Sequence, residues 1–427
     1  YGGLTMLKDL IASLNTSSLE NASEAYNLIK HHYPNNINEV EFTQQFKKPA
    51  LEDFSLIIGT NKDKLEALRQ ELKKQQFAAY ILSTNDEYLN EYTPMFAKRL
   101  FYITGFNGSY GFAVITLNSA ALFVDGRYTA QAAEQVDSNL FQVLPLSYNN
   151  IISYLTKNLT PNEIIALNSK TISYSLANLI ETELHKANLK LTFLNNDLID
   201  NIWQNQPPEP ISPIFIYHEK YAGESTNTKL NKIIKYLEQE NLDALLVPSL
   251  DNIAWLLNIR GNDIECSPLT LASLIIYKNG KLDLFTNKLK LLPEISKYLE
   301  NNHVTCYNSA ELINKLQQLN NKTVGLHADS SYFYYKELNN ISTIRILNCD
   351  IVANLKAIKN TTEYINTQIA HYKDGAALTK LILWLNYELE NRPFLTELEI
   401  VSKINYFKIS IDSYKSNSFP SIVASNA

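Results

Sequence analysis

Cysteine, glycine and methionine are scarce in this sequence, whose 427 residues include three cysteines, 12 glycines and two methionines. The cysteines, Cys266, Cys306 and Cys349, are widely spaced and odd in number. They form neither a disulfide framework nor the closely spaced pair that zinc and redox motifs use. We therefore predict a reducing compartment, with cysteines that are buried or without special chemistry.

Long apolar runs are absent as well. No stretch approaches the roughly 18 apolar residues that cross a bilayer, and the N-terminus lacks the charged and apolar segments of a signal peptide. The net charge of −6 gives no basic surface for nucleic acid. These absences argue against membrane and nucleic-acid partners and predict a cytoplasmic protein.

The length allows two or three domains, each with its own core. The chain begins at Tyr1, has no Met before Met6, and stops at Ala427 without a closing element, which predicts a segment of a longer polypeptide. Residues 1–57 have amphipathic helical spacing but no chemical motif. We predict a helical extension there, with no role that the sequence reveals.

The sequence repeats itself at an offset of 165 residues. This offset pairs Lys64 with Lys229 and Asp86 with Asp251. In each copy an amphipathic helical pattern leads to a buried strand, an Asp-containing loop and a β-hairpin. Two related α/β domains in tandem are the simplest explanation, and chance similarity between two helix-strand patterns is the alternative.

The repeat defines the predicted domains. We predict domain I at residues 58–206 and domain II at residues 212–350, each with a mixed sheet flanked by helices. The expected central strands are residues 78–82 and 244–247. Prolines at the end of residues 202–210 favour an extended linker between the domains.

The pattern changes again near Ala353, where we predict a third region, residues 353–427. Residues 361–390 have helical periodicity without proline. Thr396 and Glu399 then have the spacing of a capping box, which predicts the start of another helix.

The segment from Arg99 to Tyr128 contains the most informative motif. Residues 112–116 and 120–124 read as a β-hairpin, and residues 129–135 permit a helix. Arg127 therefore stands at a strand-turn-helix junction, where side chains are often presented to a ligand. A solvated surface arginine is the alternative. Phosphate binding is disfavoured because the nearby glycines precede a hairpin and not a helix.

Several blocks occur in the order typical of one family: Glu91-Tyr92; residues 99–111; Asp125-Gly126-Arg127-Tyr128 with Gln131-Ala132; residues 202–210; residues 250–263; residues 356–360; residues 370–375; Thr396-Glu397; and Ser418-Phe419-Pro420. With these blocks the chain resembles the long-form aminopeptidases P, the Xaa-Pro aminopeptidases of the pitta-bread metallopeptidase clan. The resemblance runs from about residue 60 to the last residue.

The resemblance implies two creatinase-type N-terminal domains followed by the start of a pitta-bread α+β domain. It implies removal of the N-terminal residue from peptides with proline second, by a two-metal mechanism that usually uses manganese. It also implies a homodimer. Arg127 matches the arginine that contacts the bound peptide in the family, so we predict that Arg127 binds substrate.

The sequence departs from the family pattern at its end. The family's metal ligands, two Asp, one His and two Glu, lie beyond the block that matches Ser418-Phe419-Pro420, and the chain ends seven residues after Pro420. We therefore predict a truncated chain with no catalytic residue, no metal ligand and no activity alone. The seven histidines offer no substitute: His31, His32, His185, His218, His303, His327 and His371.

Three aspartates that follow strands, Asp86, Asp251 and Asp263, are expected to cap or turn the chain instead of acting as acids. Two functional interpretations stay open. The chain is most of an Xaa-Pro aminopeptidase whose catalytic end is supplied by further sequence, or it is a non-catalytic binding or dimerisation module or decayed gene product of the same family.

Overall fold

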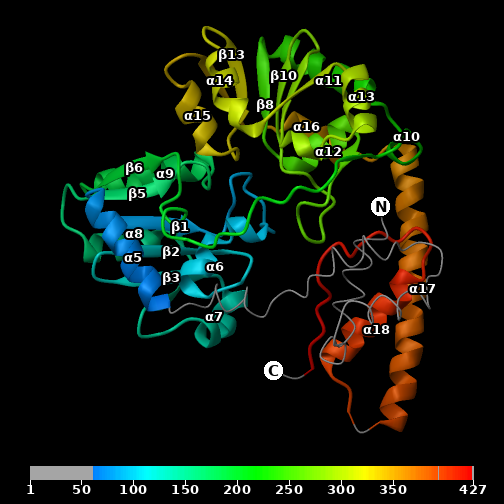
Figure 1. Ribbon diagram of the computed structural model, residues 1–427, viewed down its shortest axis with the longest axis horizontal. Helices are drawn as coiled ribbons and strands as arrows, with labels where there is room; N and C mark the ends of the chain where they lie inside the picture. Colours follow the sequence, from blue (N-terminus) through cyan, green and yellow to red (C-terminus); the bar gives the residue numbers. More distant parts are fainter. Residues whose placement is uncertain (1–60, 393, 426–427) are drawn as a thin grey trace. The chain divides into compact units, whose positions relative to one another are not determined.

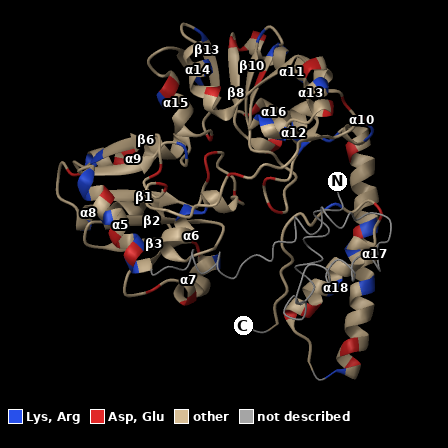
Figure 2. Cartoon of the chain, viewed as in Figure 1, with Lys and Arg blue, Asp and Glu red and all other residues tan. Residues whose placement is uncertain are grey.

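The computed structural model describes residues 61–392 and 394–425 (Figure 1). The helical extension predicted at residues 1–57, and with it His31 and His32, lies outside the described residues. Acidic and basic residues are mixed along the described helices (Figure 2). None of the described helices is long and apolar enough to span a membrane.

Domain I contains a six-stranded mixed sheet. Its strand order is β4-β3-β2-β1-β5-β6. β2 is antiparallel to both of its neighbours, and the other adjacent pairs are parallel. The strands are β1 (Ala79–Ser83), β2 (Gly111–Thr116), β3 (Ala120–Val124), β4 (Gln142–Pro145), β5 (Ile164–Asn168) and β6 (Lys190–Leu194).

Helices cover both faces of this sheet. On one face lie α5 (Asn61–Lys74), α6 (Arg99–Thr104) and α7 (Thr129–Gln135). On the other lie α8 (Tyr148–Asn158) and α9 (Tyr174–Lys186). Leu65, Leu68 and Leu72 recur at helical spacing along α5 and are fully buried, which explains how this amphipathic helix is held on the sheet. Short 3₁₀ turns, η2 (Met95–Ala97) and η3 (Gly126–Tyr128), precede α6 and α7.

Domain II repeats this topology, with strand order β12-β11-β10-β8-β13-β14. The strands are β8 (Ala244–Val247), β10 (Ser273–Tyr277), β11 (Leu282–Phe285), β12 (Val304–Tyr307), β13 (Thr323–His327) and β14 (Thr343–Leu347). One face packs against α11 (Thr226–Gln239), α12 (Leu250–Leu257), α13 (Pro293–Asn301) and α16 (Ile351–Ala357). The other packs against α14 (Leu312–Gln317) and α15 (Tyr332–Leu338).

The remaining elements of domain II are short. They are β7 (Phe215–Ile216), which pairs with β9 (Ile259–Arg260), the helix α10 (Glu219–Ala222) and the 3₁₀ turns η4 (Lys288–Lys290) and η5 (Ser309–Glu311).

The two sheets are equivalent in register as well as in order. In domain I, Ala79 of β1 lies opposite Ile165 of β5, and in domain II Ala244 of β8 lies opposite Val324 of β13. Ala79 and Ala244 are the residues that the 165-residue offset pairs. The predicted fold class, two tandem α/β domains with mixed sheets, is therefore confirmed, and chance similarity does not explain the repeat.

The domains contact each other through equivalent segments, the junctions that follow β5 and β13. The Tyr174 N–H donates to the Ser330 carbonyl, and the Tyr332 N–H donates to the Ile172 carbonyl, both at 2.8 Å. The rings of Phe193 and Tyr332 pack with centroids 4.0 Å apart. Residues 56–360 accordingly form one compact unit.

This unit extends beyond the boundary expected near Ala353. Val352 of α16 is buried in the core of domain II, and the Asn360 side chain donates to the Ala222 carbonyl at 2.7 Å. The change in sequence pattern near residue 353 therefore precedes the structural division, which falls between Asn360 and Thr361.

Residues from Thr361 onward belong to a second unit, which contains α17 (Thr361–Asn391) and α18 (Glu397–Ile409). The predicted capping box at Thr396 and Glu399 is formed at the start of α18. Among the described residues of this unit, the only buried hydrophobic side chains are those of Ala377 and Ile404. Large apolar side chains are exposed along α17: Tyr364, Ile365, Ile369, Tyr372, Leu378, Ile382, Leu383, Tyr387 and Leu389.

Candidate functional site

Arg127 lies in η3, the 3₁₀ turn between β3 and α7. Asp125 directly follows β3 and caps this turn, because its carboxylate accepts the Arg127 backbone N–H at 2.9 Å. The same carboxylate accepts the Arg127 side chain, with Nη2 at 2.7 Å from Oδ2 and Nε at 3.1 Å from Oδ1. The Arg127 side chain is 66% exposed. Asp125 therefore holds a solvent-facing guanidinium in one direction.

The electrostatics of this pair follow from the contact. Hydrogen bonds from Arg127 lower the pKa of Asp125, and hydrogen bonding to Asp125 raises the pKa of Arg127. Both groups therefore stay charged at neutral pH. A charged, oriented guanidinium can donate to a peptide carbonyl or carboxylate.

A polar cluster surrounds the arginine. The Arg127 guanidinium lies 5.2 Å from the centre of the Tyr128 ring, and the Tyr128 hydroxyl is 2.7 Å from Ser109 Oγ. Ser109 Oγ also donates to Glu91 Oε1 at 3.4 Å. The predicted motifs at Glu91-Tyr92, residues 99–111 and residues 125–128 thus come together at one corner of domain I.

The glycines in this segment have different roles. Gly105 is the left-handed C-cap of α6, with φ of +79°, a conformation that favours glycine. Gly108 is required for a different reason, because an added Cβ would lie 2.2 Å from the Phe106 ring. Gly111 lies within β2 and makes no bend.

The three aspartates considered as acids are not brought together. Asp86 accepts the backbone N–H groups of Tyr88 and Asn90, both at 3.0 Å, in the turn predicted for it. Asp263 is fully buried against Lys290 at 2.7 Å. Asp251 lies in the first turn of α12 and not in a loop, and it pairs with Lys356.

A two-metal centre needs several carboxylates and histidines around each ion. Within residues 61–392 and 394–425, no group of three or more His, Cys, Asp or Glu side chains converges on a point that could hold a metal ion. These residues therefore do not fit the metal pair of the family. Of the cysteines, Cys266 and Cys306 are half-buried, and Cys349 is exposed.

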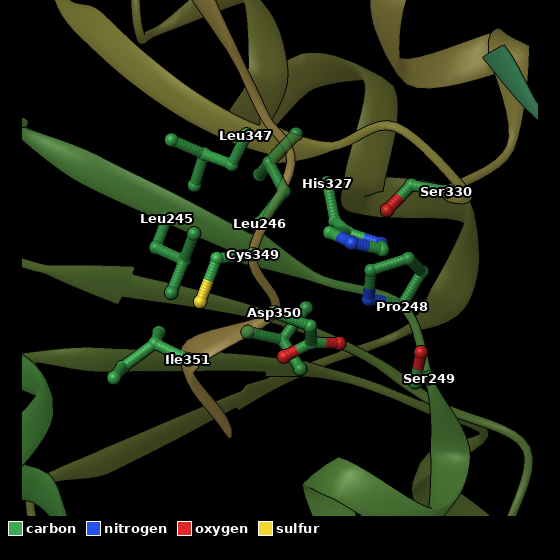
Figure 3. Close-up of a pocket in the computed structure, with 11 residues that line it drawn as sticks. Leu245, Leu246, Pro248, Ser249, His327, Ser330, Leu347, Cys349, Asp350 and Ile351 are labelled. Atoms are coloured by element: carbon green, nitrogen blue, oxygen red, sulfur yellow. The ribbon is translucent and has the colours of Figure 1, made fainter. Parts of the chain in front are cut away.

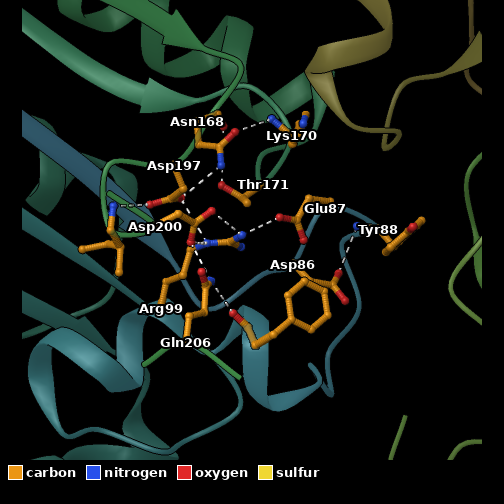
Figure 4. A network of polar contacts seen from close by, with 12 residues as sticks. Asp86, Glu87, Tyr88, Arg99, Asn168, Lys170, Thr171, Asp197, Asp200 and Gln206 are labelled. Carbon is orange, nitrogen blue, oxygen red and sulfur yellow. Dashed lines mark hydrogen bonds and ion pairs between the residues drawn. The ribbon is translucent and has the colours of Figure 1, made fainter. Parts of the chain in front are cut away.

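Arg99, the first residue of the motif at residues 99–111, has a structural role. It is 4% exposed and donates to Glu87 at 2.6 Å and to both oxygens of Asp200 at 2.7 and 2.9 Å (Figure 4). Gln206 donates to Asp200 at 2.8 Å and so joins the linker to this network. In the sequence, the only sign of this Arg99 network is an arginine at the start of an otherwise apolar helix.

Comparison with known protein families first identifies the class of protein to which this chain belongs. The Creatinase/Prolidase N-terminal domain family matches the chain twice, at residues 64–195 and 205–363. The chain is therefore a protein with tandem creatinase/prolidase N-terminal domains, which agrees with the repeated sheets.

Similar proteins from other organisms specify this class of protein further. The chain is 32% identical over 356 residues to Xaa-Pro aminopeptidase ApepP of Drosophila melanogaster, a match that covers 82% of this chain and 58% of that protein. It is 30% identical over 368 residues to a probable Xaa-Pro aminopeptidase P of Laccaria bicolor, covering 84% and 57%.

A solved structure shows the same similarity to Xaa-Pro aminopeptidases. The X-prolyl aminopeptidase of Caenorhabditis elegans, described as a cytosolic enzyme with a di-nuclear active site, matches 84% of this chain and 61% of its own with a TM-score of 0.79 and 25% identity. Over most of its own length the chain is therefore homologous to Xaa-Pro aminopeptidases. It spans less than two thirds of the length of these relatives.

Proposed function

We propose that this chain provides the two N-terminal domains and the first helices of the catalytic domain of an Xaa-Pro aminopeptidase. The reaction would be removal of the N-terminal residue from peptides with proline second, in the cytoplasm, with two manganese ions supplying the activated water. The observation that carries the proposal is the structural match of 84% of this chain to an X-prolyl aminopeptidase with a di-nuclear site.

The proposed division of labour follows the structural units. We propose different roles for domain I, for domain II with α16, and for the region from Thr361. The described residues offer no ligand set for the metal pair, so we assign the metal-dependent step to sequence outside them. Arg127 is the one described residue to which we assign substrate contact, as a charged donor for a peptide carbonyl or carboxylate.

The exposed surface of α17 supports this arrangement. Large apolar side chains lie along α17 among charged and polar ones, yet Ala377 is the only residue of α17 that is buried. We propose that the remaining two fifths or so of the relatives' length completes a domain around it.

The test compares this chain with a chimera that carries the C-terminal part of the Drosophila relative in frame. With Mn²⁺ and an Xaa-Pro tripeptide, we expect the chain alone to leave the peptide intact and the chimera to release the N-terminal residue. Metal-dependent release by the chain alone would contradict the placement of catalysis. A folded chimera without activity would contradict the proposed function.

A non-catalytic binding or dimerisation module is the second candidate, and the same exposed surface favours it. A stable dimer of the chain alone in light scattering, together with an inactive chimera, would support this candidate. A homodimer of the active chimera is expected if the family assembly applies.

A further inference from the structure

The dipeptide Asn-Gly occurs twice in the sequence, once in each domain. Asn107-Gly108 lies in the loop between α6 and β2, and Asn279-Gly280 lies in the hairpin between β10 and β11. An asparagine before glycine can lose its side-chain amide when the backbone nitrogen of the glycine attacks the side-chain carbon, because glycine has no side chain to hinder the approach. The two loops differ in whether they favour this reaction.

The nucleophile of the reaction is the backbone nitrogen of the glycine. In domain II the Gly280 N–H donates to the Tyr277 carbonyl at 2.9 Å, so the turn keeps this nitrogen in a hydrogen bond. In domain I the Gly108 N–H has no hydrogen-bond acceptor within the described part of the chain. The missing side chain of Gly108 also leaves room for the Phe106 ring. Domain I therefore keeps a glycine with a free nitrogen after its asparagine.

The electrophile is the side-chain carbonyl of the asparagine. Asn107 Oδ1 accepts two hydrogen bonds from α7, one from Gln131 Nε2 at 2.6 Å and one from Gln135 Nε2 at 2.9 Å. Negative charge develops on this oxygen when a nucleophile adds to the carbonyl, and fixed donors around such an oxygen lower the barrier. Asn279 Oδ1 accepts a single backbone N–H, that of Lys281 at 3.1 Å. The two glutamines of domain I therefore form a small oxyanion hole.

The leaving group is the side-chain nitrogen, Asn107 Nδ2. The Asn107 amide has one favourable orientation, because the reversed amide would place Nδ2 against the two glutamine donors. Gln135 is oriented by its Oε1, which accepts the Asn107 backbone N–H at 3.1 Å and Gln131 Nε2 at 3.3 Å. Asn107 is exposed, and its Nδ2 has no hydrogen-bond partner among the described residues. No contact therefore holds the leaving nitrogen in place.

We propose that Asn107 is a site of self-catalysed deamidation. The Gly108 nitrogen gives up its proton and bonds to Asn107 Cγ, the carbonyl electron pair moves to Oδ1 between the glutamine donors, and the Cγ–Nδ2 bond then breaks to release ammonia. Water opens the cyclic imide at either carbonyl, which leaves aspartate or isoaspartate in place of Asn107. The product suits its site, because a carboxylate only accepts hydrogen bonds and the glutamines supply donors.

The reaction changes the charge of domain I near its polar corner. It adds one negative charge two residues before Ser109, whose hydroxyl contacts the Tyr128 hydroxyl at 2.7 Å. The glutamines that hold the new carboxylate belong to the helix that follows the turn of Arg127. The proposal does not depend on peptidase activity, because the reaction uses only groups of domain I and water.

The test follows both Asn-Gly sites of the unchanged chain, either folded in neutral buffer or unfolded in guanidinium chloride. Peptides from each time point are analysed by chromatography and mass spectrometry, which distinguish asparagine, aspartate and isoaspartate. We expect Asn107 to react faster in the folded chain than in the unfolded chain, and Asn279 to react more slowly. Each site is compared with itself, so its sequence neighbours do not affect the result. An Asn107 that reacts no faster in the folded chain would overturn the proposal.

A variant measures the contribution of one donor. Gln131→Met keeps the length of the side chain without the donor, and it should slow the reaction at Asn107 about tenfold in the folded chain, the effect of losing one hydrogen bond to a developing charge. Glu134→Met, at an exposed position of the same helix, is the matched control and should leave the rate unchanged. Circular dichroism checks folding, and Gln135→Met replaces Gln131→Met if the latter does not fold. Equal rates at Asn107 in the folded glutamine variant and the unchanged chain would also overturn the proposal.

Discussion

Arg127 combines high exposure with a fixed direction. In the active chimera, we predict that Arg127→Ala weakens turnover of Xaa-Pro peptides, because the peptide loses a charged donor. Stability should change by less than about 0.5 kcal/mol, as is usual for an exposed side chain. Arg127→Lys should recover only part of the activity. The lysine ammonium lacks the paired planar donors with which a guanidinium can bind both Asp125 and a peptide.

A matched control for this variant is Lys186→Ala. Lys186 is 65% exposed and pairs with Glu183 at 2.6 Å, so it has the same exposure and a similar ion pair at another place. Turnover is measured with short and longer peptides, and stability is measured by thermal unfolding. If Arg127→Ala and Lys186→Ala both turn over peptides like the unchanged chimera, Arg127 is a solvated surface residue.

Asp86 makes stability depend on pH. Burial raises the pKa of Asp86 to about 6, although Asn90 and the Tyr88 N–H oppose that shift by donating to the carboxylate. A carboxyl group with a higher pKa in the folded state binds more protons there than in the unfolded state between about pH 4 and 6. The free energy of unfolding should therefore fall as pH rises through this range, by at most about 3 kcal/mol.

The Asp86→Asn variant tests this dependence. Asparagine keeps the acceptor oxygen for the turn but cannot ionise, so the pH profile of its unfolding free energy should be flatter between pH 4 and 6. Urea unfolding at several pH values gives both profiles. Parallel profiles for the two proteins would show that another group sets the slope.

At the level of secondary structure, Lys229 joins two helices of domain II. It is 1% exposed on α11, and its Nζ donates to the Trp255 carbonyl at 2.7 Å and to Asn258 Oδ1 at 2.6 Å, at the C-terminal end of α12. Lys64, its counterpart in the repeat, lies 4.6 Å from the Tyr102 ring of α6. A buried cation at a helix C-terminus satisfies carbonyls that the helix itself leaves unpaired.

We predict that Lys229→Met lowers the free energy of unfolding by roughly 2 kcal/mol, because the buried acceptors lose their donor. Lys232→Met is the control on the same helix, since Lys232 is 44% exposed and pairs with Glu224 at 2.7 Å. An exposed pair contributes at most about 1 kcal/mol, so the control should change little. Equal losses in urea unfolding would contradict a special role for Lys229.

The elements also show what a single sequence can predict. The hairpin of domain I, the central strands and the capping box of α18 depend on local spacing, and they were predicted because alternation, turn residues and caps are local signals. The polar centre at Arg99 was not predicted, because Glu87 and Asp200 meet it only in the folded domain. Similarly, the small pocket lined by Pro248, His327 and Asp350 depends on which residues the register of three strands brings together (Figure 3).

For the molecule as a whole, the two units differ in how they use their apolar residues. The described residues up to Asn360 bury large apolar clusters between sheets and helices, whereas the described residues from Thr361 expose most of their apolar side chains. A domain needs a second layer against its apolar surface, and large exposed apolar patches bind partners or aggregate. The stability of the chain should therefore reside in the first unit.

We predict that a fragment of residues 56–360 unfolds at the same temperature as the full chain, within a few degrees, and stays monomeric. The full chain should bind the dye ANS and self-associate as its concentration rises, because α17 and α18 present apolar side chains. Replacing Ile382 and Leu383, which are 55% and 65% exposed, by Gln should reduce both effects without lowering the unfolding temperature of residues 56–360. Calorimetry, dye fluorescence and light scattering measure these quantities. A fragment that fails to fold would contradict the conclusion that the stability of the chain resides in the first unit.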